Sequence, residues 1–70
     1  MLDKECAQAI KQHALTAISE LSRALNASSG RCTQEEYEKI RRGVGLVIGR
    51  IETDLLGIVY SAYPDLDDLK

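Results

Sequence analysis

The sequence contains no Phe or Trp, and it has only three Tyr, one Pro and two Cys among its 70 residues. A core must therefore be built from Ala, Leu, Ile and Val, which suits closely packed helices. Two cysteines are too few for a disulfide framework, and no CxxC or Cys/His cluster indicates a zinc site. A chain of this length forms one small domain whose core is marginal without additional stabilisation. Because the sequence offers neither a disulfide framework nor a metal site, oligomerisation is the remaining way to stabilise this core.

Strong net charge and long apolar runs are also missing. The formal net charge is −2, so no overall field attracts nucleic acid or an anionic membrane. The longest run of apolar and glycine residues, 43–49, is far shorter than the roughly 20 residues of a membrane span. The first residues include acidic side chains and lack the apolar stretch of a signal peptide. We therefore expect a cytoplasmic protein with reduced thiols and no membrane partner.

Two long segments have the composition and spacing of helices. Residues 2–28 contain no Pro or Gly and are rich in Ala, Leu, Gln and Glu, which favours a first helix. From 34 to 63, apolar residues recur at steps of three and four until Pro64 ends the pattern, which predicts a second helix. The two helices are similar in length, as in a helical hairpin.

The turn between the helices, residues 29–33, carries two recognisable signals. Gly30 suits the position after a helix C-terminus, where a positive φ is needed. Thr33 and Glu36 are spaced as a capping box at the start of the second helix. A connection this short implies antiparallel neighbours. The sequence therefore predicts one all-α domain over residues 1–70, an antiparallel two-helix hairpin.

An acidic tail, residues 64–70, follows the second helix. We expect this tail to fray, as short charged termini usually do. Alternatively, Leu66 and Leu69 fold back and cover the end of the hairpin.

The second helix has more apolar surface than a hairpin uses. Its main stripe, expected to face the first helix without a break in helical phase, comprises Tyr37, Ile40, Val44, Val47, Ile51, Leu55, Ile58 and Ala62. A second apolar face lies beside this stripe, and on it Gly45 and Gly49 permit close approach of another helix. An exposed apolar face marks an interaction site, which predicts a twofold dimer that forms a four-helix bundle. The predicted dimer interface consists of Gly45, Ile48, Gly49, Leu56, Val59 and Tyr63.

Two competing interpretations of the apolar segment are weaker. The stretches GVGLVIGRI and LLGIVYSAY are rich in β-branched residues, but their connector, Glu-Thr-Asp, is not a preferred hairpin turn. GVGLVIG also differs by one residue from the dinucleotide-binding fingerprint, which needs a preceding strand and a βαβ unit. Neither is expected here, so helix packing explains the glycines best.

The sequence shows no arrangement of residues that carries chemistry. His13 is the only histidine, and no nucleophile or metal ligand is fixed beside it by local spacing. Cys6 and Cys32 lie at opposite ends of the predicted hairpin and are expected to be free thiols, although an antiparallel dimer brings Cys6 toward the partner's turn. We therefore expect no enzyme, and no catalytic, metal-binding or cofactor-binding residues.

Two functional hypotheses remain. The first is a small non-enzymatic interaction or regulatory module that acts as a homodimer, with itself or another protein as its partner. The alternative is a nucleic-acid-binding four-helix-bundle dimer that uses Lys39, Arg42 and Arg50. Pairs of opposite charge four residues apart weaken this alternative, because they neutralise the basic side chains within the helix. The expected pairs are Glu35–Lys39, Glu38–Arg42 and Arg50–Asp54.

Overall fold

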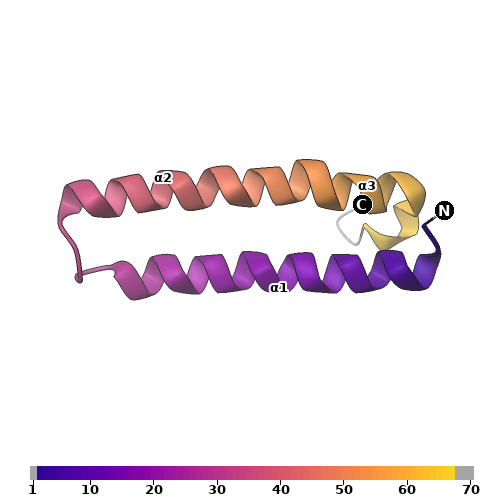
Figure 1. The fold of residues 1–70 in the computed structure, drawn as a ribbon, viewed down its shortest axis with the longest axis horizontal. Coiled ribbons are helices and arrows are strands. Elements are labelled where there is room, and N and C mark those ends of the chain that lie inside the picture. Colours follow the sequence, from indigo (N-terminus) through magenta and orange to yellow (C-terminus); the bar gives the residue numbers. More distant parts are fainter. Residues whose placement is uncertain (1, 68–70) are drawn as a thin grey trace.

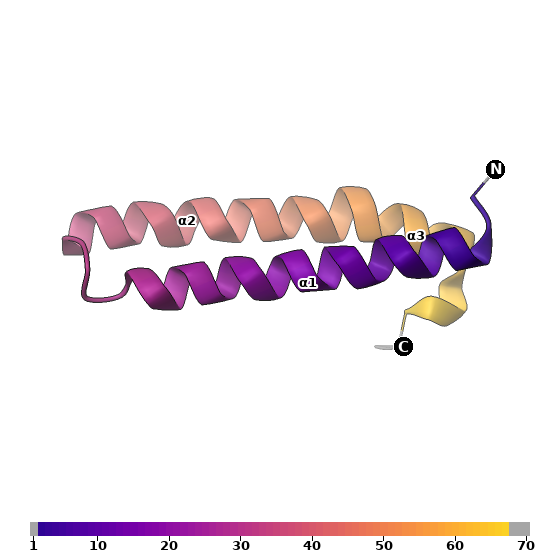
Figure 2. The same ribbon diagram turned by 60° about the horizontal axis from the view of Figure 1, so that its bottom comes forward.

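The computed structural model describes residues 2–67, whose regular structure is entirely helical. Its elements are α1 (Lys4–Ser28), α2 (Gln34–Arg50), the π-helix η1 (Ile51–Leu56), α3 (Gly57–Ala62) and the 3-10 helix η2 (Pro64–Leu66). α2, η1 and α3 form one continuous rod that runs antiparallel to α1 (Figure 1; Figure 2). The molecule is elongated, with extents of 46 × 22 × 16 Å. The predicted all-helical hairpin is confirmed.

Local hydrogen bonds fix where each long helix begins and where the first one ends. The Asp3 carboxylate accepts from the backbone N–H of Cys6 at 2.7 Å and caps α1. Thr33 and Glu36 form the predicted capping box, with donor–acceptor distances of 2.9 and 3.1 Å. The backbone N–H of Thr33 holds the pKa of the Glu36 carboxyl below its usual value. Gly30 has a φ of 79°, as its place in the turn requires.

The π-helix η1 is the main departure from the predicted pattern. A π turn holds one residue more than an α turn, so the residues after it are rotated by about 100° from their expected positions. Leu56 and Val59 are therefore buried in the places expected for Leu55 and Ile58. Leu55 and Ile58 are 39% and 61% exposed. The prediction that one apolar stripe continues unbroken to the end of the second helix is wrong for this reason.

The buried core lies at the end of the hairpin where the termini meet. Its central cluster consists of Ala7, Val59 and Leu66, and Ala14 and Leu56 are also buried. Val59 is the largest side chain that is fully buried. α2 contains no buried residue. The partly buried side chains around the core are Leu2, Ile10, Tyr60 and Tyr63. The half of the hairpin that carries the turn therefore has no core of its own.

The C-terminal segment folds back onto α1 instead of fraying at Pro64. Leu66 is 7% exposed and packs against Ala7 and Val59. The expected fraying is therefore wrong at Leu66, and the alternative fold-back holds for this residue. Leu69 lies outside the described residues.

Polar contacts also hold this segment. The Lys11 ammonium donates to the Leu66 carbonyl at 2.6 Å, and the Tyr63 hydroxyl donates to the Leu2 carbonyl at 2.9 Å. Lys4 forms an ion pair with Asp65 and thereby holds the pKa of the Asp65 carboxyl below its usual value. The Lys4–Asp65 pair therefore contributes its full stability when the pH is above the usual pKa of an aspartate. This contribution is lost as the pH falls through the lowered pKa of Asp65.

Replacing Leu66 with alanine should destabilise the hairpin substantially. Removal of a buried leucine side chain from a core costs about 2–3 kcal/mol when the neighbours cannot close the cavity. Chemical denaturation of both proteins at one fixed concentration measures the change in the free energy of unfolding. A change below about 0.5 kcal/mol, the size expected at a surface site, would mean that the segment frays in solution.

Candidate interaction surface

The six residues predicted for the dimer interface do not lie on one exposed surface. Leu56 and Val59 are core residues of the hairpin, because η1 rotates them toward α1. Tyr63 and Ile48 are half-buried, whereas Gly45 and Gly49 are exposed. A β-carbon added to either glycine would meet no described atom within 4 Å, so α1 does not make the close approach that these glycines permit. Contact between the glycines and a partner stays a prediction.

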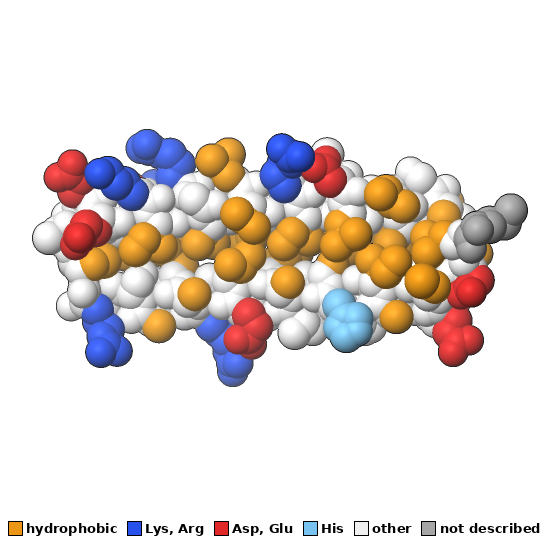
Figure 3. All heavy atoms as spheres, in the orientation of Figure 1, with side chains coloured by type: hydrophobic (Ala, Val, Ile, Leu, Met, Phe, Trp, Pro, Cys, Tyr) orange, Lys and Arg blue, Asp and Glu red, His pale blue; other side chains and the backbone are white. Residues whose placement is uncertain are grey.

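A different apolar surface lies open along the seam between the two helical rods. It is formed by two shallow grooves that share Ile51 and Leu55. Figure 3 shows apolar side chains following this seam over most of the molecule. We call it the open face, and its residues are Ile10, His13, Ala14, Ala17, Leu46, Val47, Arg50, Ile51, Asp54 and Leu55.

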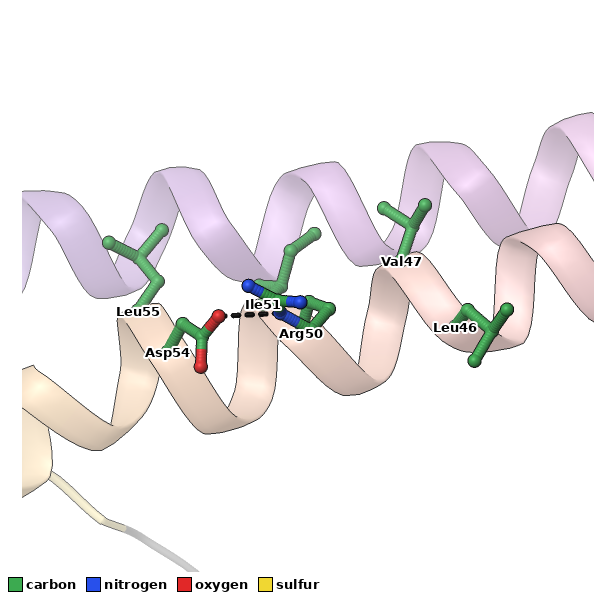
Figure 4. A pocket seen from close by; sticks show the side chains of 6 residues that line it. All are labelled: Leu46, Val47, Arg50, Ile51, Asp54 and Leu55. Carbon is green, nitrogen blue, oxygen red and sulfur yellow. Dashed lines mark hydrogen bonds and ion pairs between the residues drawn. The ribbon is translucent and has the colours of Figure 1, made fainter.

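The open face exposes large side chains that a monomer would normally bury. In Figure 4, Val47, Ile51 and Leu55 project from α2 and η1 on the side of α1, and Leu46 lies at the outer edge. Val47 is 47% and Leu46 is 68% exposed. Within the described residues, six large apolar side chains are exposed, and five of them belong to α2, η1 or α3. These five are Ile40, Leu46, Val47, Leu55 and Ile58.

The charges on the open face largely cancel. Arg50 Nε donates to Asp54 Oδ2 at 2.6 Å, which is the predicted pair (Figure 4). Both side chains are more than half exposed, so the pair adds well under about 1 kcal/mol to stability. Its effect is to leave no net charge beside Val47 and Leu55. His13 is the only other titratable side chain in the two grooves.

The three basic residues of the nucleic-acid hypothesis are all exposed on α2 but differ in their pairing. Arg50 is neutralised by Asp54. Glu38 pairs with Arg41, three residues later, at 3.0 Å. The predicted pair between Glu38 and Arg42, four residues apart, is therefore wrong. Lys39 and Arg42 form no ion pair with any residue in the range 2–67.

Other candidate residues remain isolated. Cys6 is exposed, and Cys32 is half-buried with its thiol directed at the Ser28 carbonyl, 3.4 Å away. His13 is exposed. Within residues 2–67, no three His, Cys, Asp or Glu side chains are grouped to hold a metal ion. Each helix in the same range is too short or too polar to cross a bilayer.

Sequence reasoning missed the open face because it assigned these residues to intrachain contacts. The helical spacing of apolar residues in 2–28 places Ile10, Ala14 and Ala17 on one stripe of the first helix, which is expected to face the second helix. Val47 and Ile51 belong to the stripe of the second helix that is expected to face the first. Each stripe is wider than one neighbouring helix covers. The width of the stripes, about 120° on the first helix, was the signal available in the sequence.

Comparisons of the chain with models of protein families, with curated proteins and with solved structures gave no match. Any statement about function therefore rests on the geometry of the open face.

Proposed function

We propose that this protein is a small non-enzymatic interaction module that acts as a homodimer. Two hairpins pack through their open faces and form a four-helix bundle. The observation that carries the proposal is the open face itself, an apolar seam that leaves Val47 and Leu55 exposed along a hairpin with little core.

The solvent-exposed area of the hairpin supports the proposal that a partner covers part of its surface. A compact monomer of 7.7 kDa is expected to expose about 4,300 Å² of surface, whereas the hairpin exposes 5304 Å². The excess, about 1,000 Å², exceeds the roughly 800 Å² that each partner buries in a standard protein interface.

The distribution of the core supports the same proposal. α2 has no buried residue, and the fully buried side chains gather around Val59 and Leu66 near the termini. A helical layer needs another layer against its apolar side to form a core. In the proposed bundle, the partner provides this layer for Val47, Ile51 and the turn half of α1.

A second copy suits the open face better than a strongly charged partner does. A twofold interface brings each surface against itself, so any net charge would face a like charge. The only ion pair on this surface, Arg50 with Asp54, is neutral as a unit. The same pairing removes Arg50 from the nucleic-acid alternative, whereas Lys39 and Arg42 form no ion pair within residues 2–67. We propose the homodimer because the open face carries no net charge.

Light scattering at micromolar concentration tests the homodimer. The expected molar mass is twice the 7.7 kDa of one chain. A folded, cooperatively melting monomer at that concentration would overturn the proposal. Retention on an immobilised nucleic acid that weakens steeply with salt would favour the alternative instead.

A further inference from the structure

The two halves of the hairpin differ in charge. We divide the described residues at the middle of both helical rods, so that residues 17–48 form the turn half and residues 2–16 and 49–67 form the terminal half. The turn half has five basic and four acidic residues, a net charge of +1. The terminal half has three basic and six acidic residues, a net charge of −3. In Figure 3, basic side chains lie over the turn half and the middle of the molecule, whereas acidic ones lie at both ends and in the middle.

The open face is accessible along its length in both halves. The C-terminal segment contacts the hairpin around Lys11 and Ala7, and neither of its residues Leu66 and Asp67 lines the open face. Figure 2 shows η2 displaced to one side of α1 and not lying along the seam. A partner hairpin therefore has room to lie over the whole seam.

A twofold dimer through this face has two possible orientations. If the axis runs along the hairpin, the two turns lie at the same end of the bundle. If the axis runs across the hairpin, the turns lie at opposite ends. Both orientations bury the same two surfaces, so apolar burial alone does not separate them.

We infer that the two hairpins of the homodimer lie antiparallel, with the basic turn half of each over the acidic terminal half of the other. This inference rests on the proposed function. The antiparallel orientation places a charge of +1 beside −3 at both ends, whereas the parallel one places −3 beside −3 at one end. Packed helices lie about 8–10 Å apart, close to the Debye length at physiological ionic strength, so salt weakens this repulsion without abolishing it between the nearest charges.

The orientation also determines how basic side chains are presented. The exposed basic residues Arg31, Lys39, Arg41 and Arg42 lie in the turn or early in α2. In the antiparallel dimer, the two sets are separated by roughly the 46 Å length of the hairpin. They therefore form two small patches, and no single doubled patch is presented to a nucleic acid.

A distance between two spin labels in the turns tests the orientation. The variant carries Cys6→Ser and Cys32→Ser, which remove the native thiols, and Ser29→Cys, which places one label at an exposed turn position. Pulsed electron paramagnetic resonance should give a label-to-label distance near the 46 Å length of the hairpin. In a parallel dimer, the two turns adjoin and the distance falls below about 20 Å.

The molar mass of the same labelled sample separates the possible failures. A dimer with the short distance overturns the antiparallel orientation and leaves the homodimer intact. A monomer overturns both the homodimer and the orientation. Arg31→Cys in the same background labels a second exposed turn position and should give the same long distance if Ser29→Cys disturbs the turn.

Discussion

Replacing Val47 with glutamate should convert the dimer into a monomer. Val47 lines the open face and is 47% exposed in the single hairpin, so the proposed partner would cover it. A carboxylate buried without a partner costs several kcal/mol, and the twofold axis introduces two of them in each dimer. We therefore expect the dissociation constant of the dimer to rise by at least about 100-fold, which corresponds to about 2.8 kcal/mol. Sedimentation equilibrium over a range of concentrations measures this change.

Ser22→Glu is the matched control for Val47→Glu. It adds the same charge at an exposed position of α1 that lines neither groove of the open face. The control should change the dissociation constant by less than about fivefold, since surface substitutions shift free energies by only about 0.5 kcal/mol. Equal effects of the two substitutions would show that added charge, and not loss of the open face, causes dissociation.

Deleting Thr53 should leave the fold intact, although a deletion inside a helix is normally disruptive. Thr53 is exposed and lies within η1, where the rod holds one residue more than an α-helix needs. After the deletion, an uninterrupted α-helix places Leu56 and Val59 four and seven residues after Ile51, on the face toward α1. The two side chains keep their buried positions. Thermal unfolding should therefore occur within about 5 °C of the parent protein, equivalent to a change of no more than about 1 kcal/mol.

Deleting Gln12 provides the contrast. Gln12 is also exposed within a helix, but α1 has no extra residue to lose. Its removal rotates Ala7 by about 100° relative to Ala14 and turns Ala7 away from Val59 and Leu66. We expect this variant to lose cooperative unfolding, because a small core has only a few kcal/mol to lose. A Thr53 deletion that unfolds as readily as the Gln12 deletion would contradict the phase shift assigned to η1.

Local signals in the sequence were sufficient for the helix ends. The capping box of Thr33 and Glu36, the positive φ of Gly30 and the stop at Pro64 each depend on a few neighbouring residues. These signals act within one turn of backbone, so reading them requires no knowledge of the tertiary contacts. The fold class could be predicted from them together with the helical spacing.

The face that α3 buries could not be predicted in the same way. Leu55 and Leu56 are adjacent leucines, and Ile58 and Val59 are adjacent β-branched residues, so a rotation of one residue exchanges similar side chains. Hydrophobic spacing therefore fits both registers almost equally well. The structure adopts the register that buries Val59 and lets the Tyr63 hydroxyl reach the Leu2 carbonyl. That contact joins residues far apart in the sequence and leaves no local signal.

The open face could not be predicted from the sequence for a related reason. Its residues belong to the edges of two stripes that face each other, and the sequence does not show how much of each stripe the opposite helix covers. In the structure, α1 leaves Val47 and Leu55 exposed while Leu56 and Val59 are covered. The interface expected around Gly45 and Gly49 has therefore lost Leu56 and Val59 to the core, whereas Val47 and Leu55 stay exposed on the open face.

Isotope-filtered NMR on a dimer assembled from one labelled and one unlabelled chain tests the open-face homodimer most directly. The experiment detects only contacts between the two chains. We predict intermolecular nuclear Overhauser effects from the methyl groups of Val47, Ile51 and Leu55. Intermolecular contacts confined to Gly45, Ile48 and Gly49, or no intermolecular contacts at millimolar concentration, would contradict the proposed assembly.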